Sequence, residues 1–274
     1  LTFTSTDWDT PQTVTVSGID DGFVDGDIVS TITVAVDDAN SDDDFDSVAD
    51  ETVSATTTDD DVAGFTIVET DDTTEVAESG TTDTFTIVLD AQPTTDVVMS
   101  VSSSDTAETT VNPSSITFTS ADWDTPQTVT VTGADEQIVD GDQVTAITIS
   151  VLDTASDDNF DDLADQTVSA ITTDDDVAGF TIVESDGSTE LNESGSTDTF
   201  TVVLDAQPAS DVVLTITSDD TGEATVNTPL TFTPANWDTP QTVTVTGVDD
   251  DIIDGTITSA LTVAVDDANS DDDF

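Results

Sequence analysis

Two identical runs of three aspartates, Asp59–Asp61 and Asp174–Asp176, are the residues of this sequence most suited to chemistry. Each run closes the stretch "TTDDD" and leads directly into "VAGFTIVE". The chain contains 62 Asp and Glu residues and no Lys, Arg or His, so its formal net charge is −62. Because no side chain of the protein can neutralise these carboxylates, we expect them either to stay apart in water or to bind cations.

The composition also disfavours several classes of function. A chain without cationic side chains repels nucleic acid backbones and anionic lipid surfaces, so we expect neither as a partner. Nucleophilic catalysis needs an activating base such as His, Lys or Cys, and the sequence has none of these, so we do not expect an enzyme. No apolar run approaches the roughly 20 residues that span a bilayer, and we expect no membrane insertion.

The sequence is built from repeats of about 115 residues. The stretch "DWDTPQTVTV" at Asp7–Val16 returns at Asp122–Val131 and, as "NWDTPQTVTV", at Asn236–Val245. This period is too long for a solenoid unit and predicts independent domains. We place the C-terminal part of one repeat at 1–61, a complete repeat at 62–176, and a repeat lacking its last strand at 177–274. Since the chain starts and stops inside repeats, we expect a segment of a longer tandem array.

Alternating apolar and polar residues predict that the complete repeat is all-β. Apolar residues make up only 35% of the chain, so a core depends on regular placement, as in the run Phe85, Ile87 and Leu89. The seven predicted strands are Gly64–Glu69, Asp83–Asp90, Asp96–Ser103, Ser115–Thr119, Gln127–Gly133, Gln143–Leu152 and Gln166–Thr173. Seven short strands separated by turn residues predict an immunoglobulin-like Greek-key sandwich in each repeat. We interpret the acidic stretch Asp37–Glu51 as a long hairpin loop, and Trp123 as a cap on the core.

The arrangement resembles the Calx-beta domain along the whole chain. The matching elements are an acid in the first loop (Glu78 and Glu193), an acidic loop after the Trp-led strand (Asp20–Asp27, Ala134–Asp142 and Val248–Gly255), and the terminal aspartate triplet. The resemblance implies a calcium-binding immunoglobulin-like sandwich of the type found in sodium–calcium exchangers and in secreted adhesins of marine bacteria. One departure is that the family's "SDY" loop is missing, and Asp105 or Glu108, and Asp219 or Glu223, are the candidate replacements.

In a seven-stranded sandwich, the first loop, the loop between the fifth and sixth strands and the end of the last strand meet at one pole. Two like charges about 4 Å apart repel by ~4 kcal/mol at an effective dielectric constant of ~20. Several such pairs would exceed the ~5–15 kcal/mol net stability of a domain. Calcium fits because it accepts six to eight oxygen ligands in flexible geometry, whereas zinc prefers His and Cys.

The predicted calcium ligands come from these three elements in all repeats. They are Asp20, Asp21, Asp25, Asp27, Asp59, Asp60, Asp61, Glu78, Asp135, Glu136, Asp140, Asp142, Asp174, Asp175, Asp176, Glu193, Asp249, Asp250 and Asp254.

The predicted function is structural and non-catalytic. Because the aspartate triplet runs into the next repeat without a flexible linker, a cation at this junction would fix the angle between neighbours. We therefore expect a calcium-rigidified tandem-repeat shaft of an extracellular adhesin or cell-surface filament. Its expected partners are calcium ions, neighbouring repeats of the chain and further copies that assemble into fibres. Two alternatives stay open, which are a calcium-sensing regulatory module and a surface-layer or matrix subunit.

Overall fold

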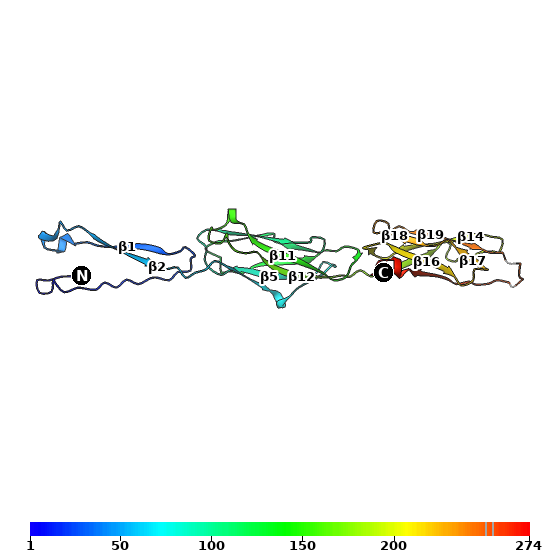
Figure 1. Cartoon of the computed structure of the whole chain (residues 1–274), viewed down its shortest axis with the longest axis horizontal. Coiled ribbons are helices and arrows are strands. Elements are labelled where there is room, and N and C mark those ends of the chain that lie inside the picture. The colour runs from blue at the N-terminus through cyan, green and yellow to red at the C-terminus, as the bar shows by residue number, and fades with distance from the viewer. Residues whose placement is uncertain (250, 254) are drawn as a thin grey trace.

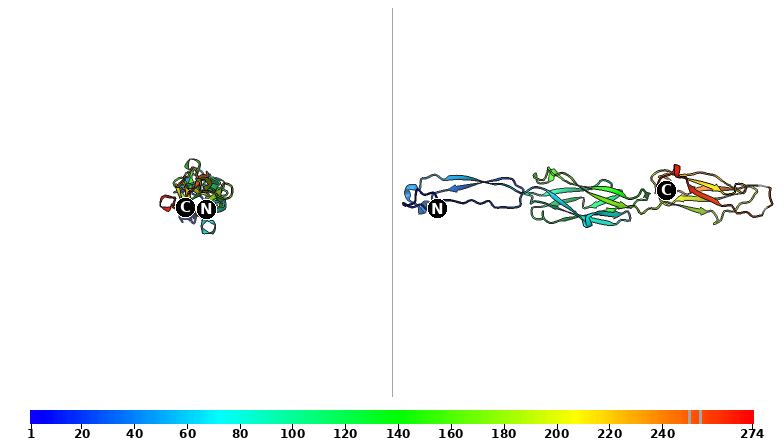
Figure 2. Two further views of the ribbon diagram at one scale, coloured as in Figure 1. Left: turned by 90° about the vertical axis from the view of Figure 1, so that its right-hand side faces the viewer. Right: turned by 60° about the horizontal axis from the view of Figure 1, so that its bottom comes forward.

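The chain is an elongated row of three groups of strands, which lie end to end along one axis (Figure 1). This computed structural model describes every residue except Asp250 and Asp254. A view down the long axis shows how narrow the row is (Figure 2). We call residues 1–61, 62–176 and 177–274 the first, second and third repeats. The described residues contain strands and short 3-10 turns but no α-helix, so the all-β prediction is confirmed.

The second repeat is a two-layer β-sandwich. One sheet has the order β3 (Phe65–Glu69), β5 (Thr82–Leu89), β9 (Gln127–Gly133) and β7 (Thr109–Asn112). The other has the order β4 (Thr74–Ala77), β12 (Gln166–Thr173), β11 (Gln143–Val151), β6 (Val97–Ser103) and β8 (Ser115–Phe118). All seven predicted strands are present. The edge strands β4 and β7, of four residues each, were not predicted.

The core of the second repeat lies between the two sheets. Phe85, Ile87 and Leu89 of β5 are buried, as their alternation predicted. Phe160, which comes from the loop between β11 and β12, is also completely buried in this core. Trp123 is partly buried and packs against the edge of the same cluster, as expected for a residue that caps the core.

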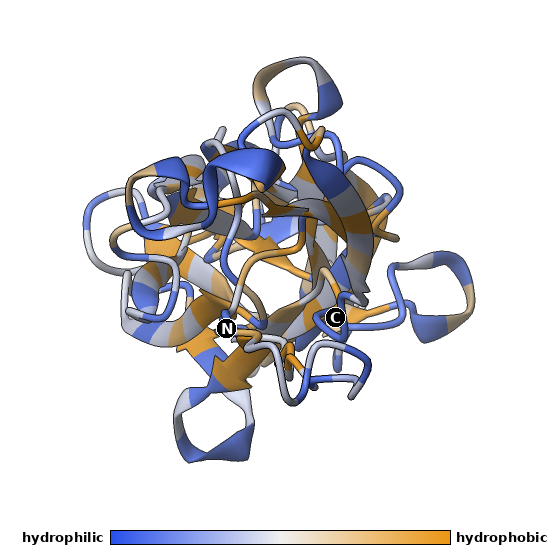
Figure 3. Ribbon diagram, turned by 90° about the vertical axis from the view of Figure 1, so that its left-hand side faces the viewer, coloured by the Kyte–Doolittle hydropathy of each residue, from blue (hydrophilic) through white to orange (hydrophobic). Residues whose placement is uncertain are grey.

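The carboxylates are segregated from the strands. Of the 62 acidic residues, only Glu51, Glu69, Glu75, Asp83, Glu184 and Asp198 belong to the strands that the structure defines. The other acidic residues that the structure describes lie in loops and turns, and an end-on view shows hydrophilic loops around strands of alternating character (Figure 3). The sides of the row are therefore mostly uncharged, and the negative charge is concentrated where strands end.

The first repeat contributes one antiparallel hairpin, β1 (Ile28–Val34) and β2 (Glu51–Thr57). The acidic stretch between these strands is a long loop with two 3-10 turns, η1 (Asp38–Asn40) and η2 (Asp43–Phe45). This hairpin corresponds in sequence to β11 and β12 of the second repeat.

The third repeat repeats most of the sandwich. One sheet has the order β13 (Phe180–Glu184), β14 (Thr197–Leu204), β19 (Gln241–Gly247) and β17 (Ala224–Val226). The other has the order β18 (Leu230–Phe232), β16 (Val212–Ser218) and β20 (Leu261–Val265). These strands enclose a second hydrophobic cluster that includes Phe200, Leu214 and Val243.

Consecutive repeats are joined by direct strand pairing. The two-residue strand β10 (Ile138–Val139) of the second repeat pairs in parallel with β15 (Gln207–Pro208) of the third. An equivalent parallel bridge links Phe23 of the first repeat to Gln92 of the second. The sequence patterns did not predict these contacts between repeats.

The buried Phe160 and the exposed Val144, both of the second repeat, give a matched test of the fold. Truncation of the buried Phe160 to Ala leaves a cavity, so we expect Phe160→Ala to lower the free energy of unfolding by about 3–5 kcal/mol. Val144 of β11 is 69% exposed, and Val144→Ala should change stability by less than about 0.5 kcal/mol. Urea denaturation of the full chain measures both, and equal effects would contradict this assignment of the core.

Candidate cation site

Glu78 is the most unusual carboxylate of the chain because it is completely buried. It follows β4 in a tight turn, where its amide donates a hydrogen bond to the Thr173 carbonyl at 3.2 Å and Gly80 has a φ of +85°. Neither carboxylate oxygen of Glu78 has a hydrogen-bond partner among the described residues. An ionised carboxylate without partners is costly to bury, so this side chain needs either a proton or a cation.

Four further carboxylates gather around Glu78 from two other segments. Glu136 and Asp140 come from the loop between β9 and β11, and Asp174 and Asp176 follow β12. One oxygen each of Glu78, Glu136 and Asp140 lie within 4.8 Å of one another, and the same holds for Glu78, Asp174 and Asp176. A cluster that offers only oxygen ligands from three segments of the chain suits calcium. We call these five residues the cation cluster.

The loop that supplies Glu136 and Asp140 is held by backbone hydrogen bonds to the aspartate triplet. The Asp140 and Gly141 amides donate to Asp174 Oδ2 at 3.2 and 2.8 Å. In return, the Asp174 amide donates to Asp142 Oδ1 at 3.3 Å. Asp142 therefore has a clear role in holding the loop, and Asp174 both holds the loop and faces the cation cluster. The position of Gly141 requires a φ of +71°, which explains the glycine of the "DGD" motif.

Burial and mutual repulsion disturb the ionisation of the cluster. Burial raises the pKa of Glu78 to about 7, and the charges of Asp174, Glu136, Glu108 and Asp140 add to the effect. Burial likewise raises the pKa of Glu136 to about 7, followed by the charge of Asp140. Burial and the neighbouring Asp174 also raise the pKa of Asp176. The cluster therefore retains protons near neutral pH unless a cation replaces them.

Glu108 is the more buried of the two candidate replacements for the "SDY" loop in the second repeat. It is only 7% exposed, and its Oε2 atom has no hydrogen-bond partner among the described residues. Burial raises the pKa of Glu108, and the charges of Asp140, Asp105 and Asp174 add to the effect. The other candidate, Asp105, is exposed and accepts a hydrogen bond from the Ala107 amide. Sequence spacing alone did not distinguish the two.

The first repeat holds a corresponding group of carboxylates. Carboxylate oxygens of Asp20, Asp60 and Asp61 lie within 4.8 Å of one another. Asp59 has the same role as Asp174, because its Oδ2 accepts from the Asp25 and Gly26 amides at 3.0 and 2.7 Å. The Asp59 amide donates to Asp27 Oδ1 at 3.1 Å.

The remaining predicted ligands lie outside these groups. Asp21 accepts a hydrogen bond from the Phe23 amide, and Asp135 and Asp175 are exposed beside the cation cluster. Glu193, the counterpart of Glu78, and Asp249 are exposed in the third repeat. Asp250 and Asp254 lie outside the described residues. A groove of the third repeat is lined in part by Glu193, Phe200, Leu261 and Val263.

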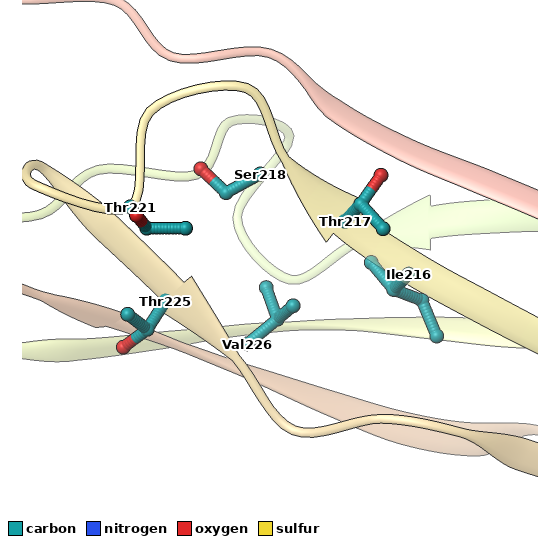
Figure 4. Close-up of a pocket in the computed structure, with 6 residues that line it drawn as sticks. All are labelled: Ile216, Thr217, Ser218, Thr221, Thr225 and Val226. Atoms are coloured by element: carbon teal, nitrogen blue, oxygen red, sulfur yellow. The ribbon is translucent and has the colours of Figure 1, made fainter.

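A separate pocket of the third repeat does not resemble a reactive site. Figure 4 shows its lining, which consists of Ile216, Thr217, Ser218, Thr221, Thr225 and Val226. These side chains offer hydroxyl groups and alkyl surface but no carboxylate and no base that could activate a hydroxyl. The acidic ends of the repeats are therefore the stronger candidates for function.

The comparisons with known proteins identify no family. The sequence matches no protein-family model and is not significantly similar to any curated protein. Among solved structures, the calcium binding domain CBD12 of CALX1.1 is 12% identical, with a TM-score of 0.28 over 73% of this chain and 80% of that chain. Domains 5–6 of the S-layer protein SbsC are 23% identical, with a TM-score of 0.28 over 74% and 90%. The E. coli chaperone DraB is 10% identical, with a TM-score of 0.32 over 66% and 84%.

These similarities are too weak to establish a function, and the Calx-beta resemblance stays a prediction. The described residues contain no helix that is long and apolar enough to cross a membrane.

The raised pKa values predict an unusual dependence of stability on pH. Because folding raises the pKa of Glu78 and Glu136 from 4.5 to about 7, their contribution to stability is complete below pH 4.5 and is lost as the pH rises through 7. In the presence of a chelator, we expect the melting temperature of the full chain to fall by roughly 5 °C or more between pH 5 and pH 8. Excess calcium should remove this fall, and a melting temperature that rises with pH in chelator would contradict the prediction.

Proposed function

We propose that this protein is a structural, non-catalytic shaft of an extracellular adhesin or cell-surface filament, in which calcium rigidifies tandem β-sandwich repeats. The observation that carries the proposal is Glu78, a fully buried carboxylate whose two oxygens lack hydrogen-bond partners at the centre of the cation cluster. A calcium ion in contact with these oxygens would supply the missing positive charge and would accept further oxygen ligands from Glu136, Asp140, Asp174 and Asp176.

The location of the cluster supports a role in stiffening the chain. Asp176 directly precedes the third repeat, and the loop that carries Glu136 and Asp140 also contains β10, which pairs with β15 of that repeat. A cation bound here would thus tie together three segments of the second repeat at the end that meets the third. Binding to the folded state alone would stabilise it by about 2.7 kcal/mol when the calcium concentration is 100 times the dissociation constant.

The shape of the chain supports a shaft rather than a compact module. The strand groups follow one another along a single axis, and the cross-section stays narrow (Figures 1 and 2). Extracellular calcium modules work with dissociation constants of about 10⁻⁴–10⁻³ M, so moderate affinity would suffice outside the cell. Uncharged strand faces along the sides would also let copies of the chain lie next to one another, as the fibre hypothesis requires.

Chelation of calcium from the full chain tests the proposed function. We expect the melting temperature to fall by several degrees, because a loss of about 1 kcal/mol moves the midpoint of a domain of about 100 residues by roughly 4–8 °C. Small-angle scattering should show a straight rod with calcium and a chain that bends more at its joints without it, although neighbouring repeats stay in contact. Magnesium at the same concentration serves as the control, since it keeps its bound waters and should stabilise the rod less. If neither the shape nor the melting temperature of the chain changed on removal of calcium, the proposal of a calcium-rigidified shaft would be wrong.

Substitution of Glu78 distinguishes an effect of calcium binding on stability from an effect of negative charge in general. In calcium, we expect Glu78→Gln to lower the melting temperature by several degrees, because the bound ion loses a buried ligand. In chelator, the same variant should be as stable as the parent protein or more stable, since one buried charge is gone. Glu75→Gln is the matched control, because Glu75 lies three residues earlier on the exposed face of β4. Differential scanning calorimetry measures the parent protein and both variants, each in calcium and in chelator. If Glu78→Gln lowered the melting temperature in calcium and in chelator alike, this would argue against a bound cation.

A further inference from the structure

The end of the second repeat that faces the first repeat carries a contact surface of its own. The Gln92 amide donates a hydrogen bond to the Gly22 carbonyl at 2.8 Å, and the Val24 amide donates to the Gln92 carbonyl at 3.2 Å. These bonds surround the parallel bridge between Phe23 and Gln92. Three residues of the first repeat, Gly22–Val24, thus extend along the turn that follows β5. We call them the docking segment.

Side chains complete this contact. Asn159 Nδ2 donates a hydrogen bond to the Val24 carbonyl at 2.7 Å. The Val24 side chain is partly buried and packs against the hydrophobic cluster of the second repeat. The joint therefore combines main-chain hydrogen bonds, one amide side chain and apolar contact. The opposite side of the loop carries Asp20, which faces Asp60 and Asp61 instead.

Asp157 organises the surface that receives the docking segment. This carboxylate is only 4% exposed, yet both of its oxygens are hydrogen-bonded. Its Oδ2 accepts from the Thr94 amide at 2.7 Å, the Thr94 hydroxyl at 2.6 Å and the Thr95 amide at 2.8 Å, and its Oδ1 accepts from the Asn159 amide at 3.0 Å. Asp157 thus fixes the turn that contains Gln92 relative to Asn159. We call residues 90–95 and 157–159 the receiving surface.

Asp157 and Glu78 are both buried carboxylates, but they differ in how the protein can stabilise their charge. Burial acts to raise the pKa of Asp157, but the hydrogen bonds from Thr94, Asn159 and Thr95 outweigh it and lower the pKa. Asp157 is therefore satisfied by protein donors, whereas Glu78 is not. Among the described residues, the grouped carboxylates that could hold a metal ion do not include any member of the receiving surface.

The third repeat repeats this surface with one difference. Asp271 is 6% exposed and accepts hydrogen bonds from the Ser210 hydroxyl at 2.9 Å and the Asp273 amide at 3.1 Å. The Gln207 amide donates to the Gln137 carbonyl at 2.7 Å, as Gln92 does to Gly22. The counterpart of Asn159, however, is Asp273, which has no side-chain donor for the carbonyl of Val139.

We propose that the receiving surface is a docking site for the extended backbone of the preceding repeat and that it works without a bound cation. Asn159 makes the first joint, between the first and second repeats, tighter than the second joint, between the second and third repeats. The docking segment needs no metal to keep its shape, because Asp59 holds the adjacent Asp25 and Gly26 amides. This inference goes beyond the calcium-dependent shaft. Each joint has a group of carboxylates on one side and a preformed protein surface on the other. The protein surface would keep neighbouring repeats in contact, though less stiffly aligned, if calcium did not bind.

Hydrogen exchange of single amides in the full chain tests this proposal. In the parent protein, the Val24 and Gln92 amides should exchange slowly both with calcium and with chelator. Asn159→Ala should speed the exchange of both by about tenfold, which corresponds to the loss of one hydrogen bond of ~1.4 kcal/mol. The Gln207 amide of the second joint should not change. Asn40→Ala is the matched control, because Asn40 is an exposed loop asparagine whose amide bonds only within the first repeat, to Asp37.

A second variant tests the role of Asn159 in the opposite direction. Asp273→Asn supplies the missing amide in the third repeat, and we expect it to slow the exchange of the Gln207 amide severalfold. The proposal is wrong if Asn159→Ala leaves the Val24 and Gln92 amides unchanged, or if Asp273→Asn leaves Gln207 unchanged. It is also wrong if chelation alone exposes the Val24 and Gln92 amides. A failure of calcium to alter the melting temperature would instead count only against the calcium-rigidified shaft.

Discussion

Uncompensated negative charge is the constraint on which the rest of this structure depends. A chain with 62 carboxylates and no cationic side chain can fold only if each carboxylate meets water, a hydrogen-bond donor, a proton or a cation. Most strands contain no carboxylate, since nearly all acidic residues lie outside them. Backbone amides donate hydrogen bonds to the carboxylates of Asp59, Asp174 and Asp157. Glu78 has no hydrogen-bond donor among the described residues, so it must keep a proton or bind a cation.

The fold was largely predictable because its strands follow a simple rule. Alternation in stretches such as Phe85 to Leu89 comes from the two-residue period of a strand with one buried face, and this signal is local. The strands that escaped prediction depend on tertiary context. β4 is a four-residue edge strand that is defined by parallel pairing with β12, about 95 residues later in the chain. No short window of sequence contains that information.

The candidate site was predictable at the level of segments and less so at the level of single residues. The topology of a sandwich brings the loops of Glu78 and Glu136 to the end of the last strand, so their proximity follows from strand order. Whether an aspartate faces an ion or holds a loop depends on distances of a few ångströms. Asp142 and Asp157 look like any other acid in the sequence, but both accept backbone amides. The burial of Glu108 likewise became visible only in three dimensions.

The parallel pairing between repeats has an evolutionary consequence. The atoms that meet at each joint are mostly main-chain amides and carbonyls, as in the pairs Gln92 with Gly22 and Gln207 with Gln137. Main-chain atoms are the same in every residue except proline and do not change when side chains mutate. Two repeats with different loop sequences can therefore be neighbours, as "GFV" and "QIV" already are here. Duplication or deletion of whole repeats by recombination would change the length of such a chain without creating an interface that selection has to rebuild.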